Sequence, residues 1–326
     1  MNKSILTAFK SVSMLLICTG ISARAADTTL TLQAPQSNPE LKCAFVAPAS
    51  LSPPRDVQLS KVFEDTFKKH PLDGARWTPY LAGSAQWPDA LNWGGMNSQK
   101  KRSLGGNNGN TGHELYVDPK YTGAGRKPLG LDPFSVSDGR LSIIARNTPA
   151  EVSDDLFGYR YISGAITSQH LFSAVNGYFE IEAKVPFGNA VWPAFWLLAD
   201  DGGSPPEIDV FEGRGQKPGT LAMSIHWKDP SGASKGCGLD KSVPDAATAF
   251  HTYGVLWEAE HVTYFIDRKA VVEIKTPPGF DKKMHVIANI GIGSDMGSVG
   301  HIDATTPEVV KMDINRISIY EINSIK

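Results

Sequence analysis

The stretch "GYFEIEAKV", Gly177 to Val185, decides the fold class of this chain of 326 residues. Every second side chain from Phe179 onward is apolar, and the side chains between them are Glu180, Glu182 and Lys184. Successive side chains of a β-strand point to opposite faces, so this alternation predicts a strand with one buried and one polar face. A helix would instead repeat its apolar residues every three or four positions.

Short β-rich segments of the same character follow along the chain, separated by turn signals such as "SDG", "KPG" and "PPGF". They begin at Leu141, Tyr161, Ala194, Leu221, Tyr253, His261, Ala270, Met284 and Met312. No helical pattern lies between them, and many short strands without helices are typical of an antiparallel sandwich. We therefore predict an all-β fold of two antiparallel sheets, forming one domain over residues 59–326.

The first 25 residues have the features of a secretory signal peptide. Lys3 and Lys10 accompany an apolar run from Val12 to Ile21, and small residues allow cleavage after Ala25. Residues 26–58 are rich in Pro, Ser, Thr and Ala without periodicity, which predicts an extended segment rather than a domain. No later stretch reaches the roughly 18 apolar residues of a membrane span. We expect a secreted protein, extracellular or periplasmic, without membrane contact.

The charge of the chain excludes partners held by bulk electrostatics. Lysine and arginine number 32 against 34 aspartate and glutamate residues, a net charge of −2 at pH 7. This balance does not favour a nucleic acid or an anionic membrane. We expect a neutral or small partner, and a monomer.

Two cysteines, Cys43 and Cys237, remain once a signal peptide containing Cys18 is removed. Disulfides persist in exported proteins, and this one would close a very long loop, stabilising the fold by about 4 to 5 kcal/mol in the chain-entropy model. Two separate thiols are the alternative.

The stretch "SPPEIDVFEGRG", Ser204 to Gly215, places three carboxylates within six residues. In a regular strand Glu207 and Asp209 share a face, but the same count turns Glu212 into the core, where an unpaired carboxylate costs several kcal/mol. One extra residue, a β-bulge near Val210 or Phe211, returns Glu212 to the face of the other two. The pattern therefore predicts a bulge.

Three carboxylates on one face favour acid-base chemistry on a glycosidic bond. Two carboxyl groups about 5 to 5.5 Å apart perform retaining hydrolysis, and a third raises the pKa of the acid by repulsion. The alternatives are a solvated acidic face or a calcium site. Trp192 and Trp196, which precede the carboxylates, have flat apolar rings of the kind that stack on sugars.

The segment "WPAFWLLADDGGSPPEIDVFEGRG" resembles the catalytic strand of family 16 glycoside hydrolases, in its bulged, laminarinase-type form. The similarity continues through "YISGAITSQHLFSAVNGYFEIEAKVPFG", "FHTYGVLWEAEHVTYFIDRKAV" and "HVIANIGIG". It implies a β-jelly-roll sandwich with a concave substrate cleft. Within the family the chain looks most like secreted bacterial endo-β-1,3-1,4-glycanases acting on exopolysaccharides such as succinoglycan. Lichenases carry a tryptophan where this chain has Pro205, so the substrate stays open.

The resemblance also implies residue roles. Glu207 would be the nucleophile, Asp209 its electrostatic helper and Glu212 the general acid/base, with no cofactor for catalysis. Asn289 and Glu180 match sugar-contacting residues, and alternation places both on the polar faces of their strands. The same carboxylates would also serve a transglycosylase, and a non-catalytic glycan-binding module on this fold is a further alternative.

Further candidates for substrate binding come from the position of each residue in its strand or loop. Trp192 is expected in the cleft, with core packing as the alternative, whereas Trp196 and Trp257 are expected in the core. His226 shares a face with Ser224, so we expect it to orient a carboxylate. Trp93, Glu114 and Tyr116 lie in a long Gly- and Asn-rich segment, residues 93–130, which is either a sugar-binding loop or a plain insertion.

Metal binding is expected only in a structural role. The histidines of the chain show no zinc-ligand spacing. The resemblance implies one possible structural calcium, held by Asp313 and by the backbone carbonyl of Gly139.

Overall fold

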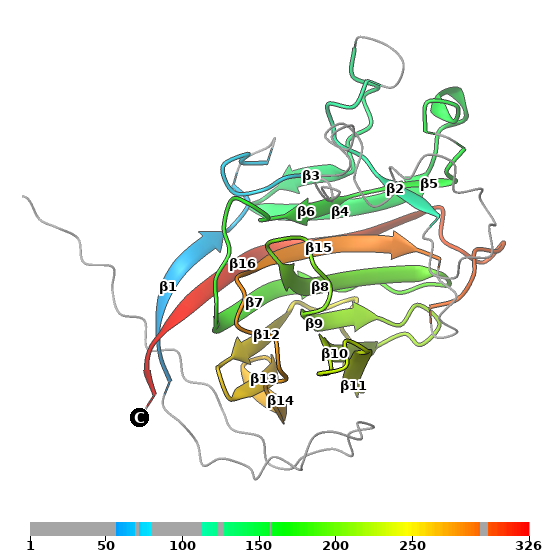
Figure 1. Ribbon diagram of the computed structural model, residues 1–326. Helices are drawn as coiled ribbons and strands as arrows, with labels where there is room; N and C mark the ends of the chain where they lie inside the picture. Colours follow the sequence, from blue (N-terminus) through cyan, green and yellow to red (C-terminus); the bar gives the residue numbers. More distant parts are fainter. Residues whose placement is uncertain are drawn as a thin grey trace, which may run out of the picture.

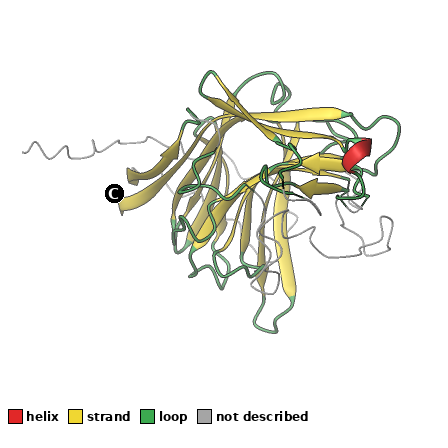
Figure 2. Cartoon of the chain, turned by 90° about the horizontal axis from the view of Figure 1, so that it is seen from above, coloured by secondary structure: helices red, strands yellow, loops and turns green. Residues whose placement is uncertain are grey.

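The computed structural model describes residues 57–68, 72–79, 113–122, 127–156, 158–293 and 299–325. The expected signal peptide, Cys43 and Trp93 lie outside these residues. The described chain forms two packed sheets, as Figure 1 shows, and no helix in it is long and apolar enough to cross a membrane. From above, Figure 2 shows strands throughout and a short 3-10 helix at Ala150–Val152.

The larger sheet has ten strands. They are β1 (Val57–Asp65), β2 (Glu114–Tyr116), β3 (Phe134–Ser137), β4 (Arg140–Asn147), β5 (Tyr161–Ser163), β7 (Gly177–Lys184), β12 (His251–Trp257), β13 (His261–Ile266), β14 (Lys269–Lys275) and β16 (Val309–Ile325). The main path runs β14-β13-β12-β7-β16-β4-β5-β2, with β1 paired to β16 and β3 to β4. The first strand among the described residues, β1, thus begins at Val57.

The smaller sheet has six strands in the order β11-β10-β9-β8-β15-β6. They are β6 (Ala165–Thr167), β8 (Val191–Ala199), β9 (Glu207–Gly213), β10 (Thr220–Lys228), β11 (Ser234–Ser242) and β15 (Met284–Ile292). The all-β sandwich is confirmed, with one correction: β2 and β5 pair in parallel, so the larger sheet is mixed rather than purely antiparallel.

The predicted segment "YISGAITS" divides at Gly164 into β5 and β6, which belong to different sheets. A Cβ at position 164 would lie 2.7 Å from a ring carbon of Phe134. Only glycine therefore lets the chain cross from one sheet to the other at this point.

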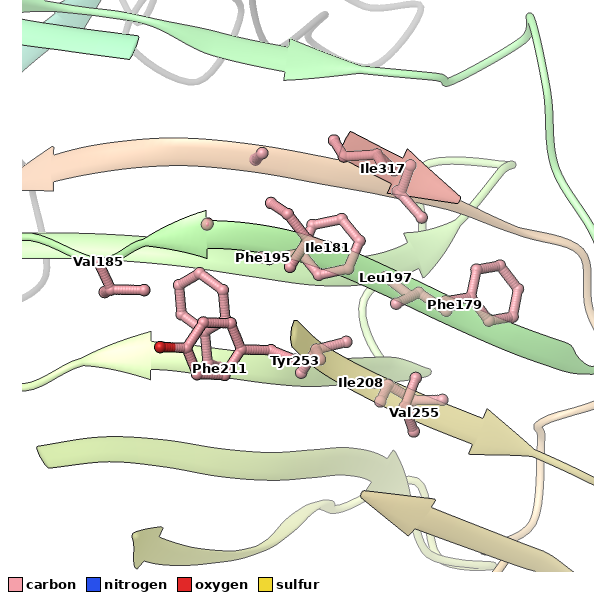
Figure 3. Close-up of a cluster of buried hydrophobic side chains, with 14 of the residues drawn as sticks. Phe179, Ile181, Val185, Phe195, Leu197, Ile208, Phe211, Tyr253, Val255 and Ile317 are labelled. Atoms are coloured by element: carbon pink, nitrogen blue, oxygen red, sulfur yellow. The ribbon is translucent and has the colours of Figure 1, made fainter. Parts of the chain in front are cut away.

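The core lies between the two sheets. Figure 3 shows Phe195 and Phe211 of the smaller sheet beside Tyr253 of the larger one. The ring centroids of Phe195 and Phe211 are 6.5 Å apart, and those of Phe211 and Tyr253 are 4.9 Å apart. Burial of each such side chain contributes roughly 1.5 to 3 kcal/mol. Because Ile208 and Phe211 belong to this core, the opposite face of β9 is left for polar side chains.

The predicted bulge is present in β9. On the β8 side, Phe211 pairs with Phe195 and Asp209 pairs with Trp196, so Val210 is the extra residue. Val210 and Phe211 are both fully buried in the core cluster. Two consecutive core side chains shift the alternation by one residue, and Glu212 returns to the face of Glu207 and Asp209.

Cys237 on β11 is disulfide-bonded. The partner that we expect, Cys43, lies outside the described residues.

Candidate active site

The three carboxylates of β9 lie in three successive cross-strand rows of the smaller sheet, on the face turned away from the core. We call it the carboxylate face. Glu207 lies between Leu198 and His226, Asp209 between Trp196 and Ser224, and Glu212 between Ala194 and Ala222. The neighbouring strands therefore decide which side chain reaches each carboxylate.

Glu207 is half-buried and is held by the turn that precedes its strand. The Ser204 hydroxyl donates to Oε2 of Glu207 at 2.6 Å. This contact fixes one carboxylate oxygen and leaves the other for a ligand, as a nucleophile requires.

Asp209 is the buried member of the group, with 3% of its surface exposed. Ser224 Oγ donates to its Oδ2 at 2.7 Å, and Nε2 of His226 lies 3.2 Å from the same oxygen. Burial raises the pKa of Asp209 to about 7, and the charges of Glu212 and Glu207 act in the same direction, while the His226 hydrogen bond opposes them. The hydrogen bond to Asp209 raises the pKa of His226, and burial opposes that shift.

Glu212 has the environment of a general acid. Burial raises its pKa, against the lowering influence of the Arg214 charge and of a hydrogen bond from Trp192. That bond runs from Trp192 Nε1 to Oε1 of Glu212 at 2.9 Å. Glu212 is thus shifted toward the protonated form while its carboxyl group is held in one orientation.

The comparison with protein-family models decides what this arrangement is. The model described as glycosyl hydrolases family 16 matches residues 133–298, just over half of the chain. The chain belongs to glycosyl hydrolase family 16. The matched segment includes the bulged strand and all three of its carboxylates.

Two relatives come from Rhizobium meliloti (strain 1021). The chain is 36% identical to endo-1,3-1,4-beta-glycanase ExsH over 186 residues, which are 57% of this chain and 38% of that protein. It is 36% identical to endo-1,3-1,4-beta-glycanase EglC over 189 residues, 58% of this chain and 39% of that protein. The chain thus spans less than half of the length of either relative.

Among solved structures, the catalytic domain of an endo-1,3-beta-glucanase (laminarinase) from Thermotoga petrophila RKU-1 is similar in fold. Its TM-score is 0.62 at 24% identity, covering 82% of this chain and all of that one. At this identity the match shows the family 16 fold alone.

The structure brings two of the predicted binding residues to the carboxylates. Trp192 contacts Glu212, and His226 contacts Asp209, both from the carboxylate face. The prediction that Trp257 packs in the core is confirmed, because that side chain is fully buried. Trp196 does not follow the same prediction: it is half-buried on the carboxylate face, where its Nε1 donates to Oδ1 of Asn289 at 2.8 Å. Trp196 follows Trp192 by four residues on β8, so strand alternation alone would have placed both side chains on the same face.

Glu180 is not in the site, contrary to the prediction. It lies on β7 of the larger sheet, where Arg268 forms two hydrogen bonds with its carboxylate at 2.9 and 3.0 Å. Arg316 and the hydroxyl of Tyr178 are further partners. Alternation correctly placed Glu180 on the face opposite the core, but that face belongs to the other sheet.

Asn289 lies on β15 beside Ala194 of β8, and β8 separates it from Glu212 on β9. Its Nδ2 donates to the hydroxyl of Tyr116 at 2.9 Å. Tyr116 and Glu114 are each 4% exposed, so neither offers a polar atom directly to a ligand. Burial raises the pKa of Glu114 to about 7. Trp93, the third residue predicted from the same segment, lies outside the described residues.

Two serines were missed as members of the site, although both contact carboxylates. Ser204 lies in the turn before β9, where side-chain direction has no periodic signal. Ser224 shares its face with His226 and was used only to place that histidine, yet it contacts Asp209 and lies 3.4 Å from Oε2 of Glu212.

Asp313, the expected calcium ligand, lies on β16 and has two polar neighbours. Ser142 Oγ donates to Oδ1 of Asp313 at 2.6 Å, and Nζ of Lys311 lies 3.3 Å from Oδ2. Calcium prefers six to eight oxygen ligands, and a calcium ion at Asp313 stays a prediction. In the described chain, the group of three side chains with metal-ligand spacing is Glu207, Asp209 and His226, with ligand atoms within 4.8 Å of one another. Gly139 lies in the turn between β3 and β4, where its φ of +67° favours glycine.

Proposed function

We propose that this protein is a retaining endo-β-glycanase that hydrolyses β-1,3- and β-1,4-linked glucans. One observation carries the proposal: the bulge at Val210 returns Glu212 to the face of Glu207, with Asp209 between them. A non-catalytic binding surface has no use for three mutually repelling carboxylates of which one is 3% exposed.

In the first step Glu212 donates its proton to the glycosidic oxygen while Glu207 attacks the anomeric carbon. The bond from that carbon to the leaving oxygen breaks, and a glycosyl ester forms on Glu207. The raised pKa of Glu212 supports its role as the proton donor. Trp192 holds the carboxyl group by its Oε1, so the proton is carried on the other oxygen.

In the second step Glu212, now a carboxylate, takes a proton from water as the water oxygen attacks the anomeric carbon. The ester bond to Glu207 breaks and the configuration of the sugar is retained. Nε2 of His226 lies 3.2 Å from Oδ2 of the buried Asp209, so a protonated imidazole offsets negative charge beside Glu207 during both steps.

The substrate class that we propose is a β-1,3-1,4-linked polymer outside the cell, such as a bacterial exopolysaccharide of the succinoglycan type. The names of the two Rhizobium relatives support the linkage class. The expected signal peptide supports export. A panel of laminarin, mixed-linkage glucan and succinoglycan-type polymer, analysed for product size and linkage, tests the assignment: release of a single terminal sugar would contradict endo action, and transfer products would identify a transglycosylase.

The matched test of the chemistry is Glu207→Gln. We expect loss of turnover with oligosaccharide binding retained, because the amide keeps the shape of the side chain but is not a nucleophile. Glu321→Gln, at an exposed position of β16, is the control and should behave as wild type. A Glu207→Gln variant with the wild-type rate would refute the proposed function.

A further inference from the structure

A chain of hydrogen bonds links the carboxylate face to a buried carboxylate on β2. Trp196 Nε1 donates to Oδ1 of Asn289 at 2.8 Å, and Nδ2 of Asn289 donates to the hydroxyl oxygen of Tyr116 at 2.9 Å. Tyr116 in turn is hydrogen-bonded to the Glu114 carboxylate. Glu114 Oε2 also accepts the backbone N–H of Ile292 at 2.9 Å.

Both ends of this hydrogen-bond chain set its direction, because the indole N–H of Trp196 only donates and the ionised carboxylate of Glu114 only accepts. When Glu114 is ionised, Tyr116 donates its proton to that carboxylate, and the Tyr116 oxygen is left to accept from Asn289. That contact decides which end of the Asn289 amide is Nδ2, and the other end, Oδ1, is then the acceptor for Trp196. An amide group has nearly the same shape in either orientation, so its partners alone fix it.

The Trp196 end of this hydrogen-bond chain lies beside the proposed catalytic carboxylates. Asn289 is in the row of Ala194 and Glu212, and Trp196 is in the row of Asp209. The two tryptophans of β8 are held in opposite directions, since Trp192 donates to Glu212 on one neighbouring strand and Trp196 to Asn289 on the other. Ala194 lies between them with only a methyl group.

We propose that Glu114 and Tyr116 are positioning residues of the sugar-binding surface, which fix the Asn289 amide and, through it, the indole of Trp196. Neither residue touches substrate. This inference rests on the proposed function, and it replaces the prediction that Glu114 and Tyr116 bind sugar themselves. It assigns them to ground-state binding of a β-glycan, so their loss raises KM and leaves kcat within about twofold, as expected when uniform binding is removed.

The test is Tyr116→Phe, which removes one hydroxyl and keeps the ring. Binding of a β-1,3-1,4-gluco-oligosaccharide is measured by calorimetry in the Glu207→Gln background, and kcat and KM are measured with Glu207 intact. We expect Kd and KM to rise about tenfold, the effect of one lost buried hydrogen bond. Tyr121→Phe is the matched control, since its hydroxyl donates to the backbone oxygen of Asp155 at 2.8 Å and takes no part in the chain.

A double-mutant cycle separates positioning from a structural role. If Tyr116 acts through Asn289, Tyr116→Phe changes Kd by less than about twofold in an Asn289→Ala background. A tenfold loss that persists in that background, or a Tyr116→Phe variant with wild-type Kd and KM, would overturn the inference while the proposed function stands. Should Tyr116→Phe fail to fold, Glu114→Gln enters the same cycle. A wild-type protein that neither binds nor cleaves any β-glucan would remove both proposals.

Discussion

The indole of Trp192 donates its Nε1–H to Oε1 of Glu212 at 2.9 Å, and the two residues lie on adjacent strands of the smaller sheet. Burial raises the pKa of Glu212 and this hydrogen bond lowers it, because the N–H stabilises the carboxylate. The proton affinity of the proposed acid is therefore a balance between these opposing effects.

Trp192→Phe tests that balance. Loss of the N–H removes a lowering influence, so the pKa of Glu212 rises further. Since the acid acts in its protonated form, the alkaline limb of the kcat/KM profile moves to higher pH, while kcat falls about tenfold because the carboxyl group loses its fixed orientation. The measurement is kcat/KM against pH on a soluble oligosaccharide. An unchanged alkaline limb would show that Trp192 does not act on Glu212.

Ser204→Ala tests the support of the proposed nucleophile. The hydroxyl of Ser204 is 2.6 Å from Oε2 of Glu207, and its loss frees that carboxylate to rotate. We expect glycosylation to slow about fivefold to tenfold, the effect of one typical hydrogen bond. Pre-steady-state release of an aryl leaving group measures this step directly. Ser231→Ala, in the β10–β11 turn, is a control, and equal effects of the two variants would argue against a specific role of Ser204.

The bulge is tested by deleting Val210. A regular strand would turn Glu212 into the core, at a cost of several kcal/mol, so we expect no detectable activity and a lowered melting temperature. Val210→Ala keeps the bulge and is the matched control: it should lose about 2 kcal/mol of stability from lost apolar burial and keep its activity. An active deletion variant would contradict the geometry of β9.

His285 on β15 makes the stability of the protein sensitive to acid. Burial lowers its pKa to about 4, from an ordinary value of 6.5, and its Nδ1 lies 3.8 Å from Oδ1 of Asp200 without a hydrogen-bond partner. A base whose pKa is depressed by folding binds its proton more readily when unfolded. Its contribution is therefore complete above pH 6.5 and is lost as the pH falls toward 4, by about 3 kcal/mol.

His285→Leu should flatten this part of the stability curve. Urea unfolding between pH 7 and 4 measures it, with His261→Asn as a control at a less buried position. Parallel pH curves for wild type and His285→Leu would exclude His285 as the source of the acid sensitivity.

Strand alternation in the sequence predicted most of the fold and the shared face of the three carboxylates. The alternation of apolar and polar residues in β7 indicated a half-buried strand. The same alternation in β9 would have placed Glu212 in the core, and this misfit predicted the bulge. Both are local properties, so they can be read from neighbouring residues alone.

The wrong predictions concern features of the fold that neighbouring residues in the sequence do not determine. Glu180 lies on the correct face of its strand, but no local signal tells which sheet that strand joins. Strand β11 was missed because it has little apolar alternation: Gly236 and Gly238 occupy it where a Cβ would lie 2.7 Å from the His226 ring and 2.9 Å from Ser224. Those glycines are dictated by contacts with β10, which only the folded chain reveals.

The most direct test of the account is to trap the glycosyl-enzyme. A 2-deoxy-2-fluoro β-glucosyl or laminaribiosyl donor with a good leaving group forms the ester and slows its hydrolysis, and peptide mass spectrometry then locates the sugar. The account predicts a single label on Glu207, absent from the Glu207→Gln variant. A label on Glu212 or Asp209, or turnover without any covalent intermediate, would contradict it.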